Sequence, residues 1–251
     1  MSALTTNNLS KSFGGVSALT KVSLGFRSGR VNALIGPNGA GKTTLFNTIC
    51  GFSPPDSGSV FQNDKEITHL PYWEIARMGI GRLFQDIRLF PQMTVEENVL
   101  VAMDPGLSER VVQHLLFGSK EAQKARSNQE RSRTLLEHLA ILELREQRAG
   151  DLSYGQQKMV GIARLLAAQP EVLLLDEPAT GLASSRIADV FGIFRSLAKQ
   201  GRTIVVIEHD MAVIRDHADY VYFLDDGQLK TQGSVTEVLQ SSEVSNAYMG
   251  V

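Results

Sequence analysis

The run GPNGAGKTT at Gly36–Thr44 has the residue types and the spacing of a phosphate-binding loop, G-x-x-x-x-G-K-[ST]. Its glycines let the backbone turn so that N–H groups converge on phosphate oxygens, and the helix that follows adds partial positive charge at its N-terminus. We expect Lys42 to reach the β- and γ-phosphates and Thr43 to ligate Mg²⁺. The residues expected to contact the nucleotide here are Gly36, Pro37, Asn38, Gly39, Ala40, Gly41, Lys42, Thr43 and Thr44. The run therefore predicts that the chain binds a nucleoside triphosphate.

Two carboxylates follow a second apolar run. Val172–Leu175 places Asp176 and Glu177 at the end of a buried strand, which lies beside the phosphate loop if the sheet is doubly wound. There Asp176 would hold Mg²⁺ through water, and Glu177 would act as a general base that polarises a water for attack on the γ-phosphate. The alternative is an acidic pair that only ends a strand before the turn at Pro178.

His209 and Gln85 are further polar candidates. His209 follows the apolar run Ile204–Ile207, so we expect it at the same end of the sheet as Glu177, where it would contact the γ-phosphate. Gln85, in RLFQDIRLF, stands where the strand-like part of the chain gives way to a helical part. By itself Gln85 is explained as a polar residue at that boundary.

Strands and helices must position these groups. Val31–Ile35 predicts a short buried strand before the loop, and Thr43–Ile49 predicts a helix after it. The opening third otherwise alternates in short bursts, which predicts twisted strands around the loop. From Gln92 to Asp151 the pattern becomes helical; the predicted helices are Val95–Met103, Ser119–His138 and Leu139–Leu144.

After Ser153 the chain returns to alternating helices and strands. The predicted order is a helix, the strand Val172–Leu175, the helix Arg186–Gln200 and the strand Thr203–Ile207. This βαβ order indicates a parallel sheet that is covered on both faces. Asp225-Asp226-Gly227 predicts the turn of a last hairpin.

Composition excludes several classes of protein. The chain of 251 residues has 25 basic and 27 acidic residues, a net charge of -2, so we expect no nucleic-acid partner. The N-terminal residues do not resemble a leader, and no apolar run approaches the ~18 residues that span a bilayer. Cys50 is the single cysteine, which makes an internal disulfide impossible, and we expect it to be a buried side chain.

The string LSYGQQK at Leu152–Lys158 distinguishes this chain from other phosphate-loop proteins. Ser153 is a good N-cap for the helix that follows, but capping does not explain the whole string. The string resembles LSGGQ, the signature of the ATP-binding cassette (ABC) family. The family's other elements stand in the expected order along the chain: Phe13, the phosphate loop, Gln85, the signature, Asp176 with Glu177, and His209.

The resemblance implies a fold and its divisions. The fold class is α/β: a P-loop NTPase (RecA-like) core with an N-terminal antiparallel β subdomain and an inserted helical subdomain. Residues 1–251 would form a single nucleotide-binding domain, with residues 1–91 and 152–251 as the core and β subdomain. Residues 92–151 would form the mostly helical subdomain.

The resemblance also implies an ATPase with ATP and Mg²⁺ as ligands, and a mechanism that needs two chains. In the family two cassettes pack head to tail, so Ser153 and Gly155 would contact the γ-phosphate held by the partner. Phe13 would stack on adenine, Gln85 would be the Q-loop glutamine that contacts Mg²⁺, and His209 would be the switch histidine. Hydrolysis would separate the dimer and move integral membrane permease subunits, with Asp86–Met93 as the candidate contact.

Two positions depart from the family pattern. Tyr154 stands in the signature where glycine is usual, which leaves Ser153 and Gly155 in place. Ala183 stands where the D-loop normally has aspartate or asparagine, so a hydrogen bond across the dimer would be lost. The second departure puts communication between the two ATP sites in doubt.

Within the family the chain is similar to the branched-chain amino acid importer cassettes of bacteria (LivG type). This similarity rests on IARMGIGRLFQDIRLFPQMTVEENVLVA, the long stretch Asp104–Gln129, LSYGQQ and the tail NAYMG. It implies a cytoplasmic subunit at the inner face of the cell membrane, with a periplasmic or surface solute-binding protein as an indirect partner. Alternatives are a cassette of a urea or amide importer, a lipopolysaccharide exporter cassette, and a soluble ABC ATPase without a membrane partner.

Overall fold

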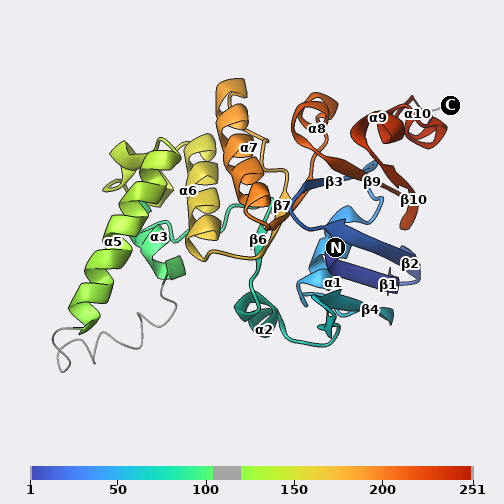
Figure 1. Ribbon diagram of the computed structural model, residues 1–251, viewed down its shortest axis with the longest axis horizontal. Coiled ribbons are helices and arrows are strands. Elements are labelled where there is room, and N and C mark those ends of the chain that lie inside the picture. Colours follow the sequence, from blue (N-terminus) through green and yellow to red (C-terminus); the bar gives the residue numbers. More distant parts are fainter. Residues whose placement is uncertain (1, 104–119, 250–251) are drawn as a thin grey trace. The chain divides into compact units, whose positions relative to one another are not determined.

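Three short strands, buried along their whole length, form the centre of the main sheet: β3 (Val31–Ile35), β7 (Val172–Asp176) and β8 (Thr203–Ile207). They run parallel, and β8 pairs with both β3 and β7. Strands buried on both faces are expected to be almost continuously apolar, as these are. The parallel sheet predicted from the βαβ order is confirmed in this computed structural model, which describes residues 2–103 and 120–249 (Figure 1).

The main sheet has six strands in the order β10-β9-β3-β8-β7-β6. The strand β9 (Tyr220–Asp225) lies parallel to β3, and β10 (Gln228–Gly233) returns antiparallel to β9, which confirms the predicted hairpin. The edge strand β6 (Ile80–Leu83) was not expected from the sequence pattern, because only four residues form it. The chain thus places the ends of β3, β7 and β8 at one edge of the sheet.

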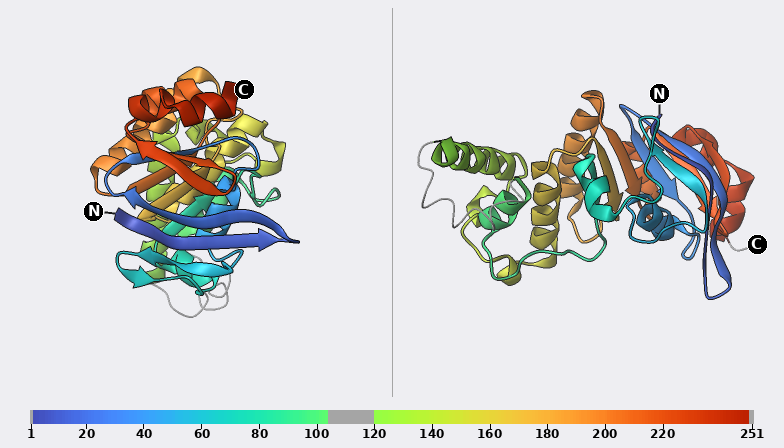
Figure 2. Two further views of the ribbon diagram at one scale, coloured as in Figure 1. Left: turned by 90° about the vertical axis from the view of Figure 1, so that its right-hand side faces the viewer. Right: turned by 90° about the horizontal axis from the view of Figure 1, so that it is seen from below.

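A second, antiparallel sheet has the order β2-β1-β4-β5. Its strands are β1 (Ser2–Phe13), β2 (Val16–Arg27), β4 (Ser57–Gln62) and β5 (Lys65–Glu66). Figure 2 shows the long β1–β2 hairpin from two further sides. The register of this hairpin shifts at several points, and Asn8 and Lys21 have positive φ angles of 47° and 49°. These irregularities bend the strands, as β-bulges do.

One hydrophobic core joins the two sheets. The helix α1 (Lys42–Ile49) contributes Leu45, Phe46 and Ile49 to it, and the strands contribute Leu4, Leu9, Phe26, Leu34, Leu174 and Val205. The helices α8 (Met211–His217) and α9 (Val235–Leu239) lie on the face of the main sheet away from α1 (Figure 1). Further helices are α2 (Tyr72–Arg77), α7 (Ser184–Lys199) and α10 (Ser242–Met249).

The described residues divide into two compact units. The first contains both sheets and is built from residues up to Arg82, Pro170–Thr180 and residues from Val190 onward. The second contains Leu83–Gln169 and Gly181–Asp189, so α7 begins in the second unit and ends in the first. The predicted helical subdomain, residues 92–151, falls within the second unit.

The second unit is helical. Its helices are α3 (Val95–Met103), α5 (Lys120–His138) and α6 (Tyr154–Ala167), with short 3₁₀ turns at Leu142–Leu144 and Ala149–Asp151. The helix α3 packs on both α5 and α6. The predicted helix Leu139–Leu144 is wrong: Ala140 has a φ of 49° and ends α5, leaving only the 3₁₀ turn. Within Asp104–Gln129, residues 104–119 lie outside the described residues, and the rest begins α5.

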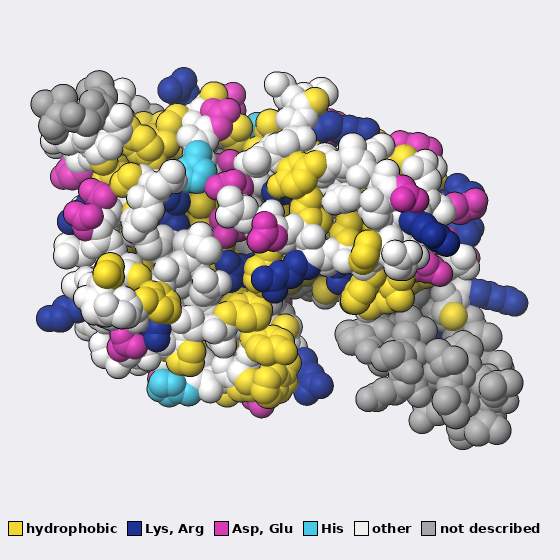
Figure 3. Space-filling model, turned by 180° about the vertical axis from the view of Figure 1, so that it is seen from behind, with side chains coloured by type: hydrophobic (Ala, Val, Ile, Leu, Met, Phe, Trp, Pro, Cys, Tyr) yellow, Lys and Arg dark blue, Asp and Glu magenta, His cyan; other side chains and the backbone are white. Residues whose placement is uncertain are grey.

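Charged side chains of both signs are interspersed on the face shown in Figure 3, in keeping with the small net charge.

Among the exposed aromatic side chains, Phe52 stacks on Tyr72 with 5.2 Å between ring centroids, and Tyr72 meets Trp73 edge-on. Across residues 2–103 and 120–249, no helix is both long enough and apolar enough to span a membrane.

Candidate nucleotide-binding site

The phosphate loop follows β3 and ends at the start of α1. Two of its glycines are required by close packing: a Cβ on Gly36 would lie 2.0 Å from the Leu224 carbonyl oxygen, and one on Gly41 would lie 2.3 Å from that of Ala18. A Cβ on Gly39 would meet nothing within 4 Å. Gly39 has a φ of 83°, so glycine serves the turn at this position and leaves the loop open on that side.

The first N–H groups of α1 have no partner within their own helix. Gly41 precedes the helix and has no side chain that could cap them. Together with the helix dipole, these groups attract an anion. The local geometry therefore fits the phosphate groups that the sequence predicts.

Lys42 is buried within the loop. Its Nζ donates hydrogen bonds to the carbonyl oxygens of Gly36 at 2.7 Å and Pro37 at 2.8 Å. Burial lowers the pKa of the Lys42 ammonium, and the nearby carboxylates of Asp176 and Glu177 offset part of that shift. The structure thus brings together the loop lysine and the two acidic residues at the end of β7, as predicted.

Asp176 and Thr43 supply the oxygen atoms that Mg²⁺ prefers. Asp176 is the last residue of β7 and is 2 % exposed, whereas Thr43 is exposed in the first turn of α1. Within residues 2–103 and 120–249, no cluster of three or more His, Cys, Asp or Glu residues could hold a metal by itself. Mg²⁺ commonly takes several of its ligands from water and phosphate oxygens.

Glu177 and His209 lie in direct contact. The Nε2 atom of His209 lies 2.9 Å from Oε1 of Glu177, and Thr180 Oγ1 donates to Oε2 of Glu177 at 3.3 Å. Glu177 has a φ of 51°, a left-handed conformation that is uncommon for glutamate and turns the chain sharply after β7. This conformation is held by a 2.9 Å hydrogen bond from the Glu177 N–H to the Ile207 carbonyl. His209 and Glu177 therefore lie at the same end of the sheet, as predicted.

The signature begins α6 in the second unit. Ser153 is its N-cap: the Gln156 N–H donates to Ser153 Oγ at 3.4 Å, and the Ser153 N–H donates to Gln156 Oε1 at 2.9 Å. This reciprocal pair is a capping box and confirms the predicted cap. A Cβ on Gly155 would lie 2.9 Å from the Gly181 carbonyl oxygen, so close packing requires glycine here as well.

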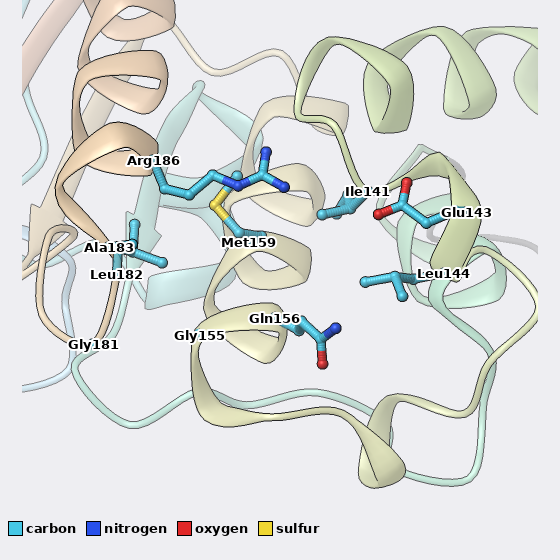
Figure 4. Close-up of a pocket in the computed structure, with 10 residues that line it drawn as sticks. All are labelled: Ile141, Glu143, Leu144, Gly155, Gln156, Met159, Gly181, Leu182, Ala183 and Arg186. Carbon is cyan, nitrogen blue, oxygen red and sulfur yellow. The ribbon is translucent and has the colours of Figure 1, made fainter.

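A pocket of about 160 Å³ lies beside Gly155, within the second unit (Figure 4). It is lined by Ile141, Glu143, Leu144, Gly155, Gln156, Met159, Gly181, Leu182, Ala183 and Arg186. The Arg186 guanidinium spans it and donates to the carbonyl oxygens of Leu139 and Ala140. Both departures from the family pattern are close by, because Tyr154 packs against Gly181 and Ala183 lines the pocket.

Comparison with known proteins decides the family. A family model described as ABC transporter matches residues 19–180. The chain belongs to this family. The cassette is 38 % identical to the high-affinity branched-chain amino acid transport ATP-binding protein LivG of Salmonella typhimurium, over 98 % of this chain and 97 % of that protein. It is 35 % identical, with the same coverage, to the corresponding protein BraF of Pseudomonas aeruginosa.

Solved structures agree with this assignment. The cassette matches the ADP conformation of an ATP-binding cassette of an ABC transporter with a TM-score of 0.83, 33 % identity and 100 % coverage of both chains. It also matches the dimeric structure of a bacterial ABC transporter cassette, with a TM-score of 0.78 and 26 % identity over 92 % of this chain and 98 % of that one. The P-loop NTPase fold is thereby confirmed, and the chain is an ATPase of the ABC type.

The sequence also singles out Phe13, Gln85 and Cys50. Phe13 ends β1, is 51 % exposed and has the Lys11 ammonium 5.4 Å from its ring centroid. Gln85 belongs to the second unit and is exposed. Cys50 is buried as expected, and burial raises the pKa of its thiol to about 11.

Two residues of the cassette site were missed from the sequence. Arg82 on β6 is buried, with Nη2 3.6 Å from Asp176 Oδ2 and Nη1 donating to Asn47 Oδ1 at 2.6 Å. Glu208, 2 % exposed, accepts a 2.7 Å hydrogen bond from the Ala179 N–H through Oε1 and so fixes the turn after Glu177. An arginine within the apolar run IGRL was a signal for a buried partner, because arginine is rarely buried alone.

Proposed function

We propose that the chain is the ATP-hydrolysing subunit that powers an importer of branched-chain or other amino acids. The observation that carries this proposal is the 35 to 38 % identity, over nearly the whole chain, to proteins named for branched-chain amino acid transport. The pairing of His209 with Glu177 beside the phosphate-loop lysine supports hydrolysis as the source of energy.

The hydrolytic step is assigned to three side chains. Lys42 binds the β- and γ-phosphates and stabilises the charge that develops there. Glu177 is the general base that takes a proton from the attacking water. His209 contacts the γ-phosphate and orients Glu177 through their 2.9 Å contact, which holds the carboxylate in one position.

The metal site is assigned to oxygen atoms of Thr43, Gln85 and Asp176, the last through water. Bound Mg²⁺ would neutralise charge on the phosphate oxygens. Gln85, as the glutamine of the Q-loop, is also assigned to the catalytic residues.

The complete site requires two chains. Ser153 and Gly155 of one cassette contact the γ-phosphate held by the other, where the N-terminus of α6 adds favourable charge. Phe13 stacks on the adenine ring, which its 51 % exposure allows. The second cassette is a copy of this chain or a related one.

The cassette acts at the inner face of the cell membrane, beside permease subunits that span it. Asp86–Met93 is the proposed contact with a permease helix, and it presents the exposed side chains of Phe90 and Met93. The Arg164 guanidinium lies 4.9 Å from the Phe90 ring centroid and also donates to the Arg88 carbonyl oxygen, so this segment is anchored from α6. A solute-binding protein outside the membrane is an indirect partner.

Purification of the chain from its native membrane tests the transport assignment. We expect permease subunits to copurify, and uptake of labelled leucine to be lost when the chain is deleted and restored when it is supplied again. If only ribosomal proteins or DNA-bound proteins copurified with the chain, the proposal would be refuted.

The Glu177→Gln variant tests the assignment of the base. The amide cannot accept the proton, so we expect hydrolysis to fall by at least about 100-fold while ATP binding is retained and a dimer accumulates on ATP. Turnover of ATP and size-exclusion chromatography with ATP measure the two effects. The control is Glu171→Gln, which changes an exposed glutamate just before β7; normal turnover by Glu177→Gln would show that another group is the base.

A further inference from the structure

The C-terminal helix reaches the first residue of the phosphate loop. The Gly36 N–H donates a 3.2 Å hydrogen bond to the hydroxyl oxygen of Tyr248, which lies 212 positions later in the sequence. Gly36 is also held by two other contacts. Its carbonyl oxygen accepts a hydrogen bond from Lys42 Nζ, and the carbonyl group of Leu224 packs where the Cβ of any other residue would lie. Its conformation is therefore fixed by three separate parts of the chain.

Tyr248 is itself held in place. Its ring lies 6.4 Å from that of Phe223 on β9, the strand beside β3. Earlier in α10, Val244 is buried, and α10 packs against α9, whose capping box of Ser234 and Glu237 fixes where that helix begins. The hydroxyl thus approaches Gly36 from a supported element and not from a loose tail.

Tyr248 is 42 % exposed, so its contact with Gly36 is only partly shielded from water. The Tyr248 phenol is neutral at physiological pH, and partial burial raises its pKa further above the ordinary value of 10.0. The oxygen of a neutral phenol can accept a hydrogen bond from the Gly36 N–H, and no charge has to be buried for this bond to form. The hydrogen bond fixes the peptide plane that contains the Gly36 N–H, where the chain enters the loop. The carbonyl oxygen of Gly36 is one of the two that accept a hydrogen bond from Lys42 Nζ.

We propose that Tyr248 is a positioning residue of the phosphate loop: its hydroxyl holds Gly36 in the conformation that places Lys42 for ATP. This proposal rests on the proposed function, since it assumes that the loop binds ATP. Tyr248 does not contact the reacting atoms. It acts on the affinity for ATP through the backbone of Gly36.

The Tyr248→Phe variant removes only the hydroxyl oxygen. Loss of one neutral hydrogen bond to the loop should raise the KM for ATP roughly fivefold while kcat changes by less than about twofold. The control is Tyr72→Phe, which removes the same atom from an exposed ring on α2. A fall in kcat of the same size as the rise in KM would overturn the proposal, because that pattern indicates general damage.

A second measurement does not depend on ATP. In the nucleotide-free protein labelled with ¹⁵N, the Gly36 amide should exchange with solvent faster in Tyr248→Phe than in the wild type or in Tyr72→Phe. Unchanged exchange at Gly36 would overturn the positioning role even if KM rose. If the wild type failed to bind ATP, the proposed function would fail, and the Gly36 exchange rates would still decide whether the contact orders the loop.

Discussion

Arg82 is a buried cation that sits between the candidate metal ligand and a helix of the phosphate loop. Its side chain is 5 % exposed and that of Asp176 is 3 % exposed, so both charges have lost most of their water. Asn47 on α1 also accepts from Arg82, and Cys50 lies close enough for the guanidinium to influence its thiol. One residue therefore links β6, β7 and α1 at the site.

Replacement of Arg82 by glutamine should remove one buried counter-charge of the Asp176 carboxylate. We expect the free energy of unfolding to fall by about 3 kcal/mol, as measured by denaturation in urea. Arg77→Gln, which changes an exposed arginine in the last turn of α2, is the control and should change stability by less than about 0.5 kcal/mol.

A double-mutant cycle separates the ion pair from other contacts of Arg82. The variant with both Arg82→Gln and Asp176→Asn should lose less stability than the sum of the single variants, because neither charge remains. Strict additivity would show that the two side chains do not interact.

At the level of elements, Asp56 ties the antiparallel sheet together. It accepts from Lys11 Nζ at 3.0 Å and from the Ser12 N–H at 2.7 Å, and so connects the end of β1 to the turn before β4. These contacts, the Lys11 hydrogen bond first, lower the pKa of the Asp56 carboxyl below its ordinary value of 3.8. The carboxylate form is thus the one that the folded sheet favours.

The sign of the pH effect follows from that lowered pKa. The contribution of Asp56 to stability is present above the unfolded pKa of 3.8 and is lost as the pH falls through the lower folded pKa. We expect the melting temperature of Asp56→Asn to lie below that of the wild type at about pH 7, and the two to converge as the pH falls below 3.8. Asp189→Asn, at an exposed position of α7, should show no such convergence; a constant gap for Asp56→Asn would contradict the assignment.

The elements themselves were largely predictable. The bounds of β3, β8 and α3 match the predicted runs, because each run has one clear period and is bounded by turn residues. The predicted helix Ser119–His138 ends where α5 ends, but the helix predicted over Leu139–Leu144 was wrong because Ala140 adopts a left-handed conformation that favours other residue types.

The candidate site was predictable where neighbouring strands end. Asp176, Glu177 and His209 follow buried strands, so a parallel sheet alone brings them together. Arg82 and Tyr248 were missed as site residues because their contacts depend on tertiary packing, which local periodicity does not encode. Tyr248 reaches Gly36 across 212 positions, and the tail was noted only for its likeness to related tails.

At the scale of the whole molecule, Ala183 is the position where the sequence predicts an effect on communication between two cassettes. It directly precedes α7, and its carbonyl accepts the first hydrogen bonds of that helix from Arg186 and Ile187. An aspartate here would therefore have two effects. It would cap α7 within the chain, and it would restore a side chain able to reach across the proposed dimer.

The Ala183→Asp variant should raise the Hill coefficient of ATP hydrolysis. Ala183→Ser is the matched control, because serine also caps the helix but is shorter, so both variants should gain about 1 kcal/mol of stability. Steady-state hydrolysis over a range of ATP concentrations gives the Hill coefficient. Equal coefficients for Ala183→Asp and the wild type would show that this side chain does not connect the two sites.

The order of strands in the main sheet also has a consequence for biosynthesis. The strand β3 precedes the phosphate loop, but its neighbours β8 and β9 are translated about 170 and about 190 residues later. While the ribosome makes the intervening residues, β3 has no strand to pair with, and pairing over such separations is slow. During that time the first apolar strands of the nascent chain lack their final partners, and exposed strands of this kind are prone to aggregate.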